Sequence, residues 1–213
     1  MKITHHPPEE LLARFAAGTL EPAERLVVAV HSSLCPHCRR FVGAIEQLAG
    51  ATLENSEPAP LAEGVFESVM SRIDAGAAPR RVEEALPSQQ EDLPELLRRC
   101  RIGKRRRVAP GVSLRPILLP ETGSTRAFLL QSAPGTRMLE HSHTGTELTC
   151  VLKGSFRHQG GNYGPGDFDF GDGTVDHQPV VGSEETCLCL VAMTGDLRMN
   201  GLLGRLIGPF VRI

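Results

Sequence analysis

The run His31-Ser-Ser-Leu-Cys35-Pro-His-Cys38 constrains this chain more than any other stretch. It holds two cysteines three residues apart, with a histidine four residues before the first. Zinc takes S and N ligands in a tetrahedron, and a short Cys-x-x-Cys turn brings two sulfurs to one ion at about 2.3 Å. Pro36 suits the first position of a helix, so Cys35 and Cys38 are expected at a helix N-terminus, where the dipole favours thiolates.

A tetrahedral zinc needs a fourth ligand from outside this motif. His5 and His6, just ahead of the first apolar run, are the nearest candidates, and their spacing does not choose between them. The alternative to a metal site is a free cysteine pair or a thioredoxin-like redox pair. No strand-helix-strand pattern surrounds the cysteines, so we expect zinc.

The region from residue 7 to 73 has helical periodicity. We expect three short helices, over residues 7–18, 22–31 and 36–50, with Gly50 as the C-terminal stop of the third. Three short helices bury little apolar area, and a domain this small usually needs a staple. A zinc ion that ties these helices together would couple folding to metal binding.

A fourth amphipathic segment follows an expected loop at residues 51–60. Its apolar side chains recur at spacings of three and four, namely Leu61, Val65, Phe66, Val69, Met70 and Ile73. This stripe either packs on the other three helices or docks on a partner protein, and the sequence leaves both interpretations open.

Residues 74–94 lose this periodicity and are rich in Ala, Pro, Glu and Gln, which is typical of a linker. We therefore predict an N-terminal domain at 1–85, a linker at 86–96 and a second domain at 97–213. A basic run then includes Lys104, Arg105, Arg106 and Arg107. No recognition-helix pattern accompanies it, and the net charge is -2, so we expect a solvated or internally paired segment and no direct binding to nucleic acid.

Membrane and export signals are missing from the pattern. No apolar run approaches the roughly 18 residues that span a bilayer, and the N-terminus lacks the apolar core of a secretion signal. Six cysteines without a small disulfide scaffold indicate cytosolic thiols or metal ligands. We expect a cytoplasmic protein that does not contact a membrane.

Beyond Val108 the sequence changes to short apolar runs broken by Gly and Pro. The expected strands lie at residues 127–130, 148–152, 168–170 and 186–191. Many short strands at regular turns suggest a closed barrel or jelly roll. The predicted fold class is therefore multidomain, with an all-α domain followed by an all-β one.

A second group of metal-ligand residues lies in this β region. His141 and His143 project to one face of an extended strand, because side chains alternate with a period of two. Glu147 can return to that face, and His177 can complete the set. Three imidazoles and a carboxylate suit Zn, Fe, Mn or Ni, and the ligand types do not choose among them.

The run from Gly135 to Gly154 resembles the first cupin motif: glycine, five residues, His-x-His, three residues, Glu, six residues, Gly. Residues 164–167, Gly-Pro-Gly-Asp, resemble the turn that begins the second cupin motif. The resemblance implies a cupin barrel whose metal ligands are His141, His143, Glu147 and His177. Zinc or another divalent metal is expected there.

The histidine and cysteine motif on short helices resembles the zinc-binding anti-sigma domain, whose partners are sigma factors of the extracytoplasmic-function group. Followed by a cupin, it resembles anti-sigma factors that release their sigma factor in response to singlet oxygen. The resemblance implies a four-helix domain that binds one sigma factor and occludes its polymerase-binding surfaces. It also implies that the zinc ligands are His6, His31, Cys35 and Cys38, and that the cupin half is needed for the response.

An enzyme is the alternative: a cupin dioxygenase or isomerase with an accessory zinc domain. Such an enzyme needs an open metal position and an acid-base group. We expect a regulatory protein and no enzyme. Cys187 and Cys189 alternate along an expected strand, and a flat strand holds them too far apart for an unstrained disulfide, so we expect both to pack in the core.

Overall fold

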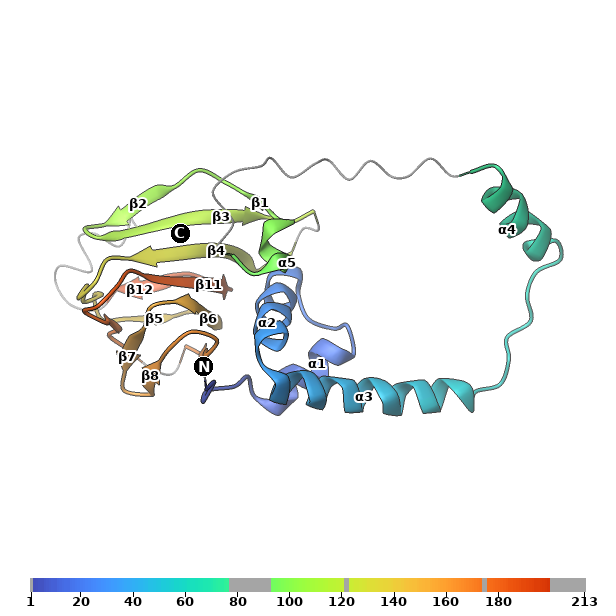
Figure 1. The fold of residues 1–213 in the computed structure, drawn as a ribbon, viewed down its shortest axis with the longest axis horizontal. Helices are drawn as coiled ribbons and strands as arrows, with labels where there is room; N and C mark the ends of the chain where they lie inside the picture. The colour runs from blue at the N-terminus through green and yellow to red at the C-terminus, as the bar shows by residue number, and fades with distance from the viewer. Residues whose placement is uncertain (1, 77–92, 121–122, 174–175, 200–213) are drawn as a thin grey trace.

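The structure is a computed structural model that describes residues 2–76, 93–120, 123–173 and 176–199, and the structural statements below concern these residues. Helices come first along the chain and strands follow, as the colours of Figure 1 show. Within the described parts, no helix is both long enough and apolar enough to cross a membrane.

Three helices lie beside the β part: α1 (Glu9–Ala16), α2 (Pro22–Leu34) and α3 (Pro36–Glu54). A proline occupies the first turn of both α2 and α3, where its fixed φ favours the helix and no N–H bond is lost. Cys35 separates these two helices and is the N-cap of α3. The predicted starts of α2 and α3 are confirmed.

Helix α3 continues past the predicted stop at Gly50 and ends at Glu54, inside the expected loop at 51–60. A glycine ends a helix by adopting a left-handed conformation, as Gly18 does after α1 with a φ of 69°. Gly50 has no positive φ and lies inside the helix. The predicted stop is wrong because a glycine inside a helix costs only about 1 kcal/mol and is tolerated.

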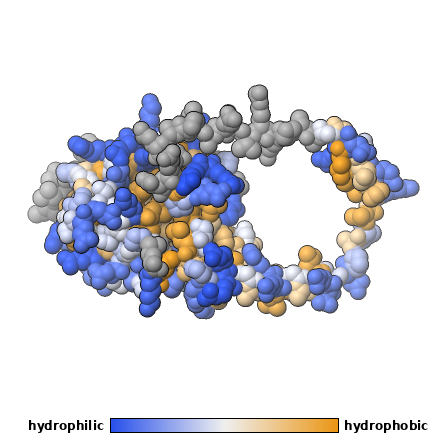
Figure 2. Space-filling view, in the orientation of Figure 1, coloured by the Kyte–Doolittle hydropathy of each residue, from blue (hydrophilic) through white to orange (hydrophobic). Residues whose placement is uncertain are grey.

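Helix α4 (Val65–Asp74) stands away from the other helices (Figure 1) and buries none of its residues. Phe66 is 71% exposed and Ile73 is 64% exposed. Figure 2 shows apolar surface over this helix and the segment leading to it, with open space between α4 and the rest of the protein. The interpretation that the stripe packs on the other helices is therefore wrong, and the structure does not confirm a four-helix domain.

A short fifth helix, α5 (Glu95–Arg98), begins in the predicted linker at 86–96. Leu97 on this helix is fully buried in the same apolar cluster as α1 and α2. Residues 86–92 of the predicted linker lie outside the described residues. The domain boundaries stay a prediction.

The remaining elements are short strands, all paired antiparallel. They are β1 (Arg101–Ile102), β2 (Arg106–Ala109), β3 (Val112–Leu118), β4 (Arg126–Ser132), β5 (His141–His143), β6 (Glu147–Lys153), β7 (Phe156–His158), β8 (Gly161–Tyr163), β9 (Phe168–Gly171), β10 (Val180–Val181), β11 (Cys187–Met193) and β12 (Leu197–Met199). The four expected strands are confirmed as β4, β6, β9 and β11.

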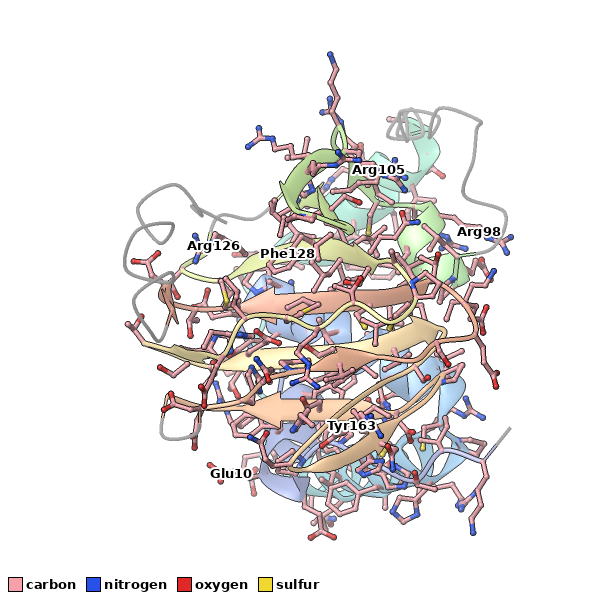
Figure 3. All side chains as sticks on the ribbon, turned by 90° about the vertical axis from the view of Figure 1, so that its left-hand side faces the viewer. Glu10, Arg98, Arg105, Arg126, Phe128 and Tyr163 are labelled. Carbon is pink, nitrogen blue, oxygen red and sulfur yellow. The ribbon has the colours of Figure 1, made fainter. Side chains whose placement is uncertain are left out.

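A seven-stranded sheet runs in the order β1-β3-β4-β11-β6-β9, with β2 added on β3. Smaller sheets form from β10-β7-β8 and from β12-β5. Among the described strands the large sheet does not close on itself, so the closed barrel is not confirmed, although the architecture is cupin-like. Figure 3 views this β part from the side away from the helices, with Phe128 on β4 and Tyr163 on β8.

Both faces of the large sheet are covered, and β11 shows this residue by residue. Cys189 and Val191 point into the interior of the β part, where they pack with Phe128. Leu190 and Ala192 alternate with them and join the cluster that includes the helices, because α2 lies across β4, β6 and β11. The helical and β parts therefore share one hydrophobic core.

Two candidate metal centres

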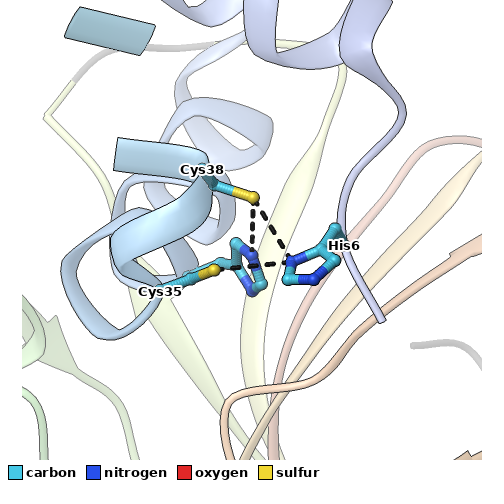
Figure 4. Close-up of side chains that lie close together, drawn as sticks. His6, Cys35 and Cys38 are labelled. Atoms are coloured by element: carbon cyan, nitrogen blue, oxygen red, sulfur yellow. Dashed lines mark hydrogen bonds between the residues drawn. The ribbon is translucent and has the colours of Figure 1, made fainter. Parts of the chain in front are cut away.

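The first centre lies where α2, α3 and the N-terminal segment meet (Figure 4). His6 Nδ1 is 3.4 Å from Cys35 Sγ and 3.5 Å from Cys38 Sγ, and His31 Nε2 is 3.3 Å from Cys38 Sγ. One potential ligand atom of each of these four residues lies within 4.8 Å of the others. The structure thus brings together the four predicted residues. His5, the other candidate, is outside this cluster.

Local sequence explains the arrangement. His31 is in the last turn of α2, Cys35 links the helices and Cys38 is in the first turn of α3. The chain reverses direction at Cys35-Pro36, because Cys35 is extended with φ -103° and ψ 105°. His6 comes from the extended segment before α1, and its position depends on tertiary contacts.

Burial governs the electrostatics of this centre. It raises the pKa of the Cys38 thiol to about 12, and the neighbouring Cys35 adds to the effect. It also lowers the pKa of His31 to about 4, although a hydrogen bond to the backbone of Gly166 opposes this. Thiolates so far from water need a cation beside them, and two S and two N donors suit tetrahedral zinc. The residues fit a zinc ion.

The ring nitrogen of His31 that faces away from the cysteines, Nδ1, has a hydrogen-bond partner typical of a metal-binding histidine. His31 Nδ1 lies 2.9 Å from the carbonyl oxygen of Gly166, to which it donates. The tautomer with hydrogen on Nδ1 leaves the lone pair of Nε2 for a metal. Gly166 belongs to the β part, so the hydrogen bond that orients the His31 ring comes from the other half of the chain.

The second centre lies inside the β part. His141 Nε2 and His177 Nε2 are 2.9 Å apart, and His143 Nε2 is 3.2 Å from His177 Nε2. Glu147 Oε2 is 3.2 Å from His143 Nε2. Strand β5 presents His141 and His143 on one face, and a β-bridge pairs His141 with His177. The four residues predicted for this centre are therefore together.

The nitrogens of the three imidazoles converge, and burial holds His143 and His177 neutral. Burial lowers the pKa of both His143 and His177 to about 4, and the adjacent His141 adds to this. His141 Nδ1 donates to the carbonyl oxygen of Leu139 at 2.7 Å, which directs its Nε2 lone pair toward the others. Three converging imidazoles with one carboxylate fit a divalent transition metal, and the donor set does not choose which one.

A histidine and an aspartate that the sequence analysis missed border this centre. His158 Nε2 is 2.9 Å from Asp169 Oδ2, and both have a potential ligand atom within 4.8 Å of one in His177. Burial opposes ionisation of Asp169, yet hydrogen bonds from His158 and Tyr163 together with the nearby His158 and His177 outweigh it, and they hold the pKa of the carboxyl below its usual value. The available signal was alternation: Asp169 stands between Phe168 and Phe170, so it faces the opposite side of β9.

A cavity of about 440 Å³ adjoins the second centre, and most of its lining is apolar. Cys187 and Cys189 are both free, buried and on its wall, with their Sγ atoms 3.6 Å apart. The expectation of a flat strand is wrong here, because the pairing of β11 with β6 shifts register between Leu188 and Cys189. The irregularity brings the sulfurs closer than a flat strand does.

The basic run lies at the edge of the β part. Arg106 and Arg107 are exposed on β2, and Arg105, labelled in Figure 3, donates a hydrogen bond to the side chain of Gln131. At least one of these cations is paired within the chain, as expected for an internally paired segment.

A helical part with a Cys₂His₂ cluster, joined to a cupin-like β part with a histidine cluster, defines a two-part protein with two candidate metal centres. The family described as the ChrR Cupin-like domain matches residues 104–195. The chain is also 38% identical over 217 residues to the anti-sigma-E factor ChrR of Cereibacter sphaeroides, covering 100% of both sequences. The chain therefore belongs to the ChrR family of anti-sigma factors.

One solved structure agrees with this assignment. The crystal structure of Rhodobacter sphaeroides SigE in complex with the anti-sigma ChrR matches 90% of this chain and 99% of that chain, with a TM-score of 0.75 and 35% identity. An RmlC-like cupin protein of Ralstonia eutropha matches 49% of this chain and 69% of its own, with a TM-score of 0.41 and 17% identity. The ChrR family is regulatory, which agrees with the prediction of no enzyme.

Proposed function

We propose that this protein is an anti-sigma factor that binds one sigma factor of the extracytoplasmic-function group and releases it in response to singlet oxygen or a related oxidant. The observation that carries the proposal is the match over 90% of the chain to a ChrR whose structure was solved in complex with a sigma factor. Because its target is a polymerase subunit, the protein acts in the cytoplasm.

The sigma-binding surface proposed here is the α4 stripe: Leu61, Val65, Phe66, Val69, Met70 and Ile73. Burying one large apolar side chain stabilises a complex by about 1.5–3 kcal/mol, so covering several exposed ones favours binding strongly. The open space beside α4 in Figure 2 is where a partner would lie against both α4 and α3. In this proposal the sigma factor fills the space between α4 and the other three helices, so the four helices expected from the sequence pack together only around the partner.

In this proposal the N-terminal centre stabilises the helical part that binds the sigma factor. His6, His31, Cys35 and Cys38 would bind zinc, which supplies a tetrahedral crosslink between the N-terminal segment and two helices. His141, His143, Glu147 and His177 would bind zinc or another divalent metal in the cupin-like part. The role proposed for the cupin-like part is to receive the oxidative signal, because its imidazoles and the adjacent buried thiols are oxidisable groups beside a cavity.

Co-purification with the cognate sigma factor tests the binding surface. The double variant Phe66→Ala with Met70→Ala should weaken sigma binding by at least tenfold in a titration. The matched control is Leu118→Ala, which removes an exposed leucine from β3 in the β part, outside both α3 and α4. Wild-type protein that does not bind the sigma factor would refute the function, and equal loss in control and double variant would refute the assigned surface.

A further inference from the structure

Residues 164–169 of the β part contact both candidate metal centres. Asp167, only 5% exposed, lies in the turn before β9 and points toward the N-terminal segment. Its Oδ1 accepts hydrogen bonds from the backbone N–H of Thr4 at 2.7 Å and of His5 at 2.9 Å, and its Oδ2 accepts one from Gly164 N–H at 2.9 Å. One carboxylate therefore ties residues 4–5 to a turn more than 150 residues away in the chain.

The backbone adds a second tie at the same place. Phe168 N–H donates to the carbonyl oxygen of His5 at 3.1 Å, and the His5 ring lies against Tyr163 with centroids 4.3 Å apart. His6 is the next residue, and it faces Cys35 and Cys38. The position of this ligand is consequently set by Asp167 and Phe168.

The other histidine ligand of the N-terminal centre is held by the same segment. Gly166 accepts the hydrogen bond of His31 Nδ1, and the Phe168 ring meets the His31 ring edge-on with centroids 5.5 Å apart. Three consecutive residues, 166–168, thus contact the His31 imidazole directly and hold His6 through the backbone of His5, the residue before it. Outer partners of this kind orient metal ligands and strengthen binding.

The next residue along the strand belongs to the other centre. Asp169 accepts a hydrogen bond from His158 and lies in the cluster that includes His177. Strand β9 also pairs with β6 so that Gly171 is opposite Glu147. Asp169 and Phe168 are consecutive residues of one strand, so a shift of the backbone at Asp169 moves Phe168 as well. Their side chains face opposite sides of the strand, and they therefore reach different centres.

We propose that Asp167 is a positioning residue for the N-terminal metal centre, and that residues 166–169 couple this centre to the cupin centre. This inference rests on the proposed function for its biological meaning. A change at the cupin ligands displaces β9. This displacement loosens the contacts that position His6 and His31, and metal binding at the N-terminal centre becomes weaker. The route bypasses the linker at 86–96.

Cobalt substitution of the full-length protein tests this coupling without any sigma factor. Thiolate-to-cobalt absorption reports only the centre that contains Cys35 and Cys38, so its decay after addition of a chelator gives the rate of metal loss there. Asp167→Ala should raise this rate by about tenfold, the lower end of the cost of removing a direct partner of a ligand, because Asp167 acts on His6 through the backbone of His5. The matched control Asp196→Asn, an exposed carboxylate of the β part, should leave the rate unchanged within twofold.

A double-mutant cycle tests the link between the centres. His141→Ala, which removes a cupin ligand, should raise the rate at the N-terminal centre at least threefold in otherwise wild-type protein. It should add less in the Asp167→Ala background, because the contacts through Asp167 are then absent and only those of Gly166 and Phe168 with His31 remain. Independent, multiplicative effects would overturn the coupling, and an unchanged rate in Asp167→Ala would overturn the positioning role.

Folding and function are separated by two further measurements. Asp167→Asn keeps the size of the side chain and should show the same direction of effect if Asp167→Ala fails to fold. Failure of sigma binding in wild-type protein would refute the proposed function and leave the cobalt result intact. An unchanged cobalt rate with normal sigma binding would refute this inference alone.

Discussion

The two candidate metal centres are similar in chemistry and different in construction. Both contain buried histidines with lowered pKa values. The cupin centre is built by antiparallel neighbours within one β part. The N-terminal centre lies at a junction, because residues 166–168 of the β part contact the His31 ring and the backbone of His5, the neighbour of His6. Loss of metal should therefore disturb the association of the two parts directly at the N-terminal centre, and at the cupin centre only through β9.

The largest effect should come from Cys35→Ser with Cys38→Ser. Zinc binding supplies about 10–16 kcal/mol to small zinc domains, and this variant would lose most of it, so the helical part should unfold and sigma binding should fall by more than 100-fold. Circular dichroism and a binding titration measure both. The control variant His37→Ala, between the two cysteines, should retain sigma binding. Loss of sigma binding in this variant would contradict the assignment of the ligands.

A smaller effect is expected from Leu97→Ala, which tests the shared core. Leu97 is fully buried where helices and sheet meet, so its truncation should cost about 2–5 kcal/mol and lower the stability of both parts together. Leu96→Ala is the matched control, since Leu96 is 39% exposed. Denaturant unfolding with separate helix and sheet probes would show two independent transitions if the parts were independent.

His143→Ala should directly remove a metal ligand from the cupin centre and from no other site. Its imidazole is fully buried among the other ligands, so metal content should fall by one ion per chain while sigma binding falls by less than tenfold. The response to singlet oxygen should be lost. Metal analysis measures the metal content, and a release assay measures the response. Loss of sigma binding equal to that of the cysteine variant would contradict the different roles assigned to the two centres.

A further effect concerns acid and the metal-free protein. The pKa values of His31, His143 and His177 are lowered to about 4 in the folded state, against 6.5 for the ordinary side chain. Between these values the unfolded chain binds more protons, so stability should be full above pH 6.5 and decline as the pH falls toward 4. Urea midpoints across this range measure it. Midpoints independent of pH would contradict buried neutral histidines.

Local rules made much of the structure predictable. Pro22 and Pro36 mark helix starts, and the alternation of His141 and His143 gives a common face, because both depend on backbone geometry over a few residues. The Cys-x-x-Cys motif and the cupin spacing likewise identify ligand sets that the structure brings together. Gly50 failed as a stop because a glycine inside a helix costs only about 1 kcal/mol, which is too little to end α3 by itself.

The sequence by itself determined the types of ligand, the order of helices before strands, and the amphipathic stripe on α4. Only the tertiary structure decided that His6 and not His5 joins the cysteines, that this stripe is exposed, and that Asp167 and Gly166 support the N-terminal centre. The physical reason is distance along the chain: a hydrogen bond between residues 31 and 166 leaves no periodic signal, and it exists only once both parts have packed on a common core.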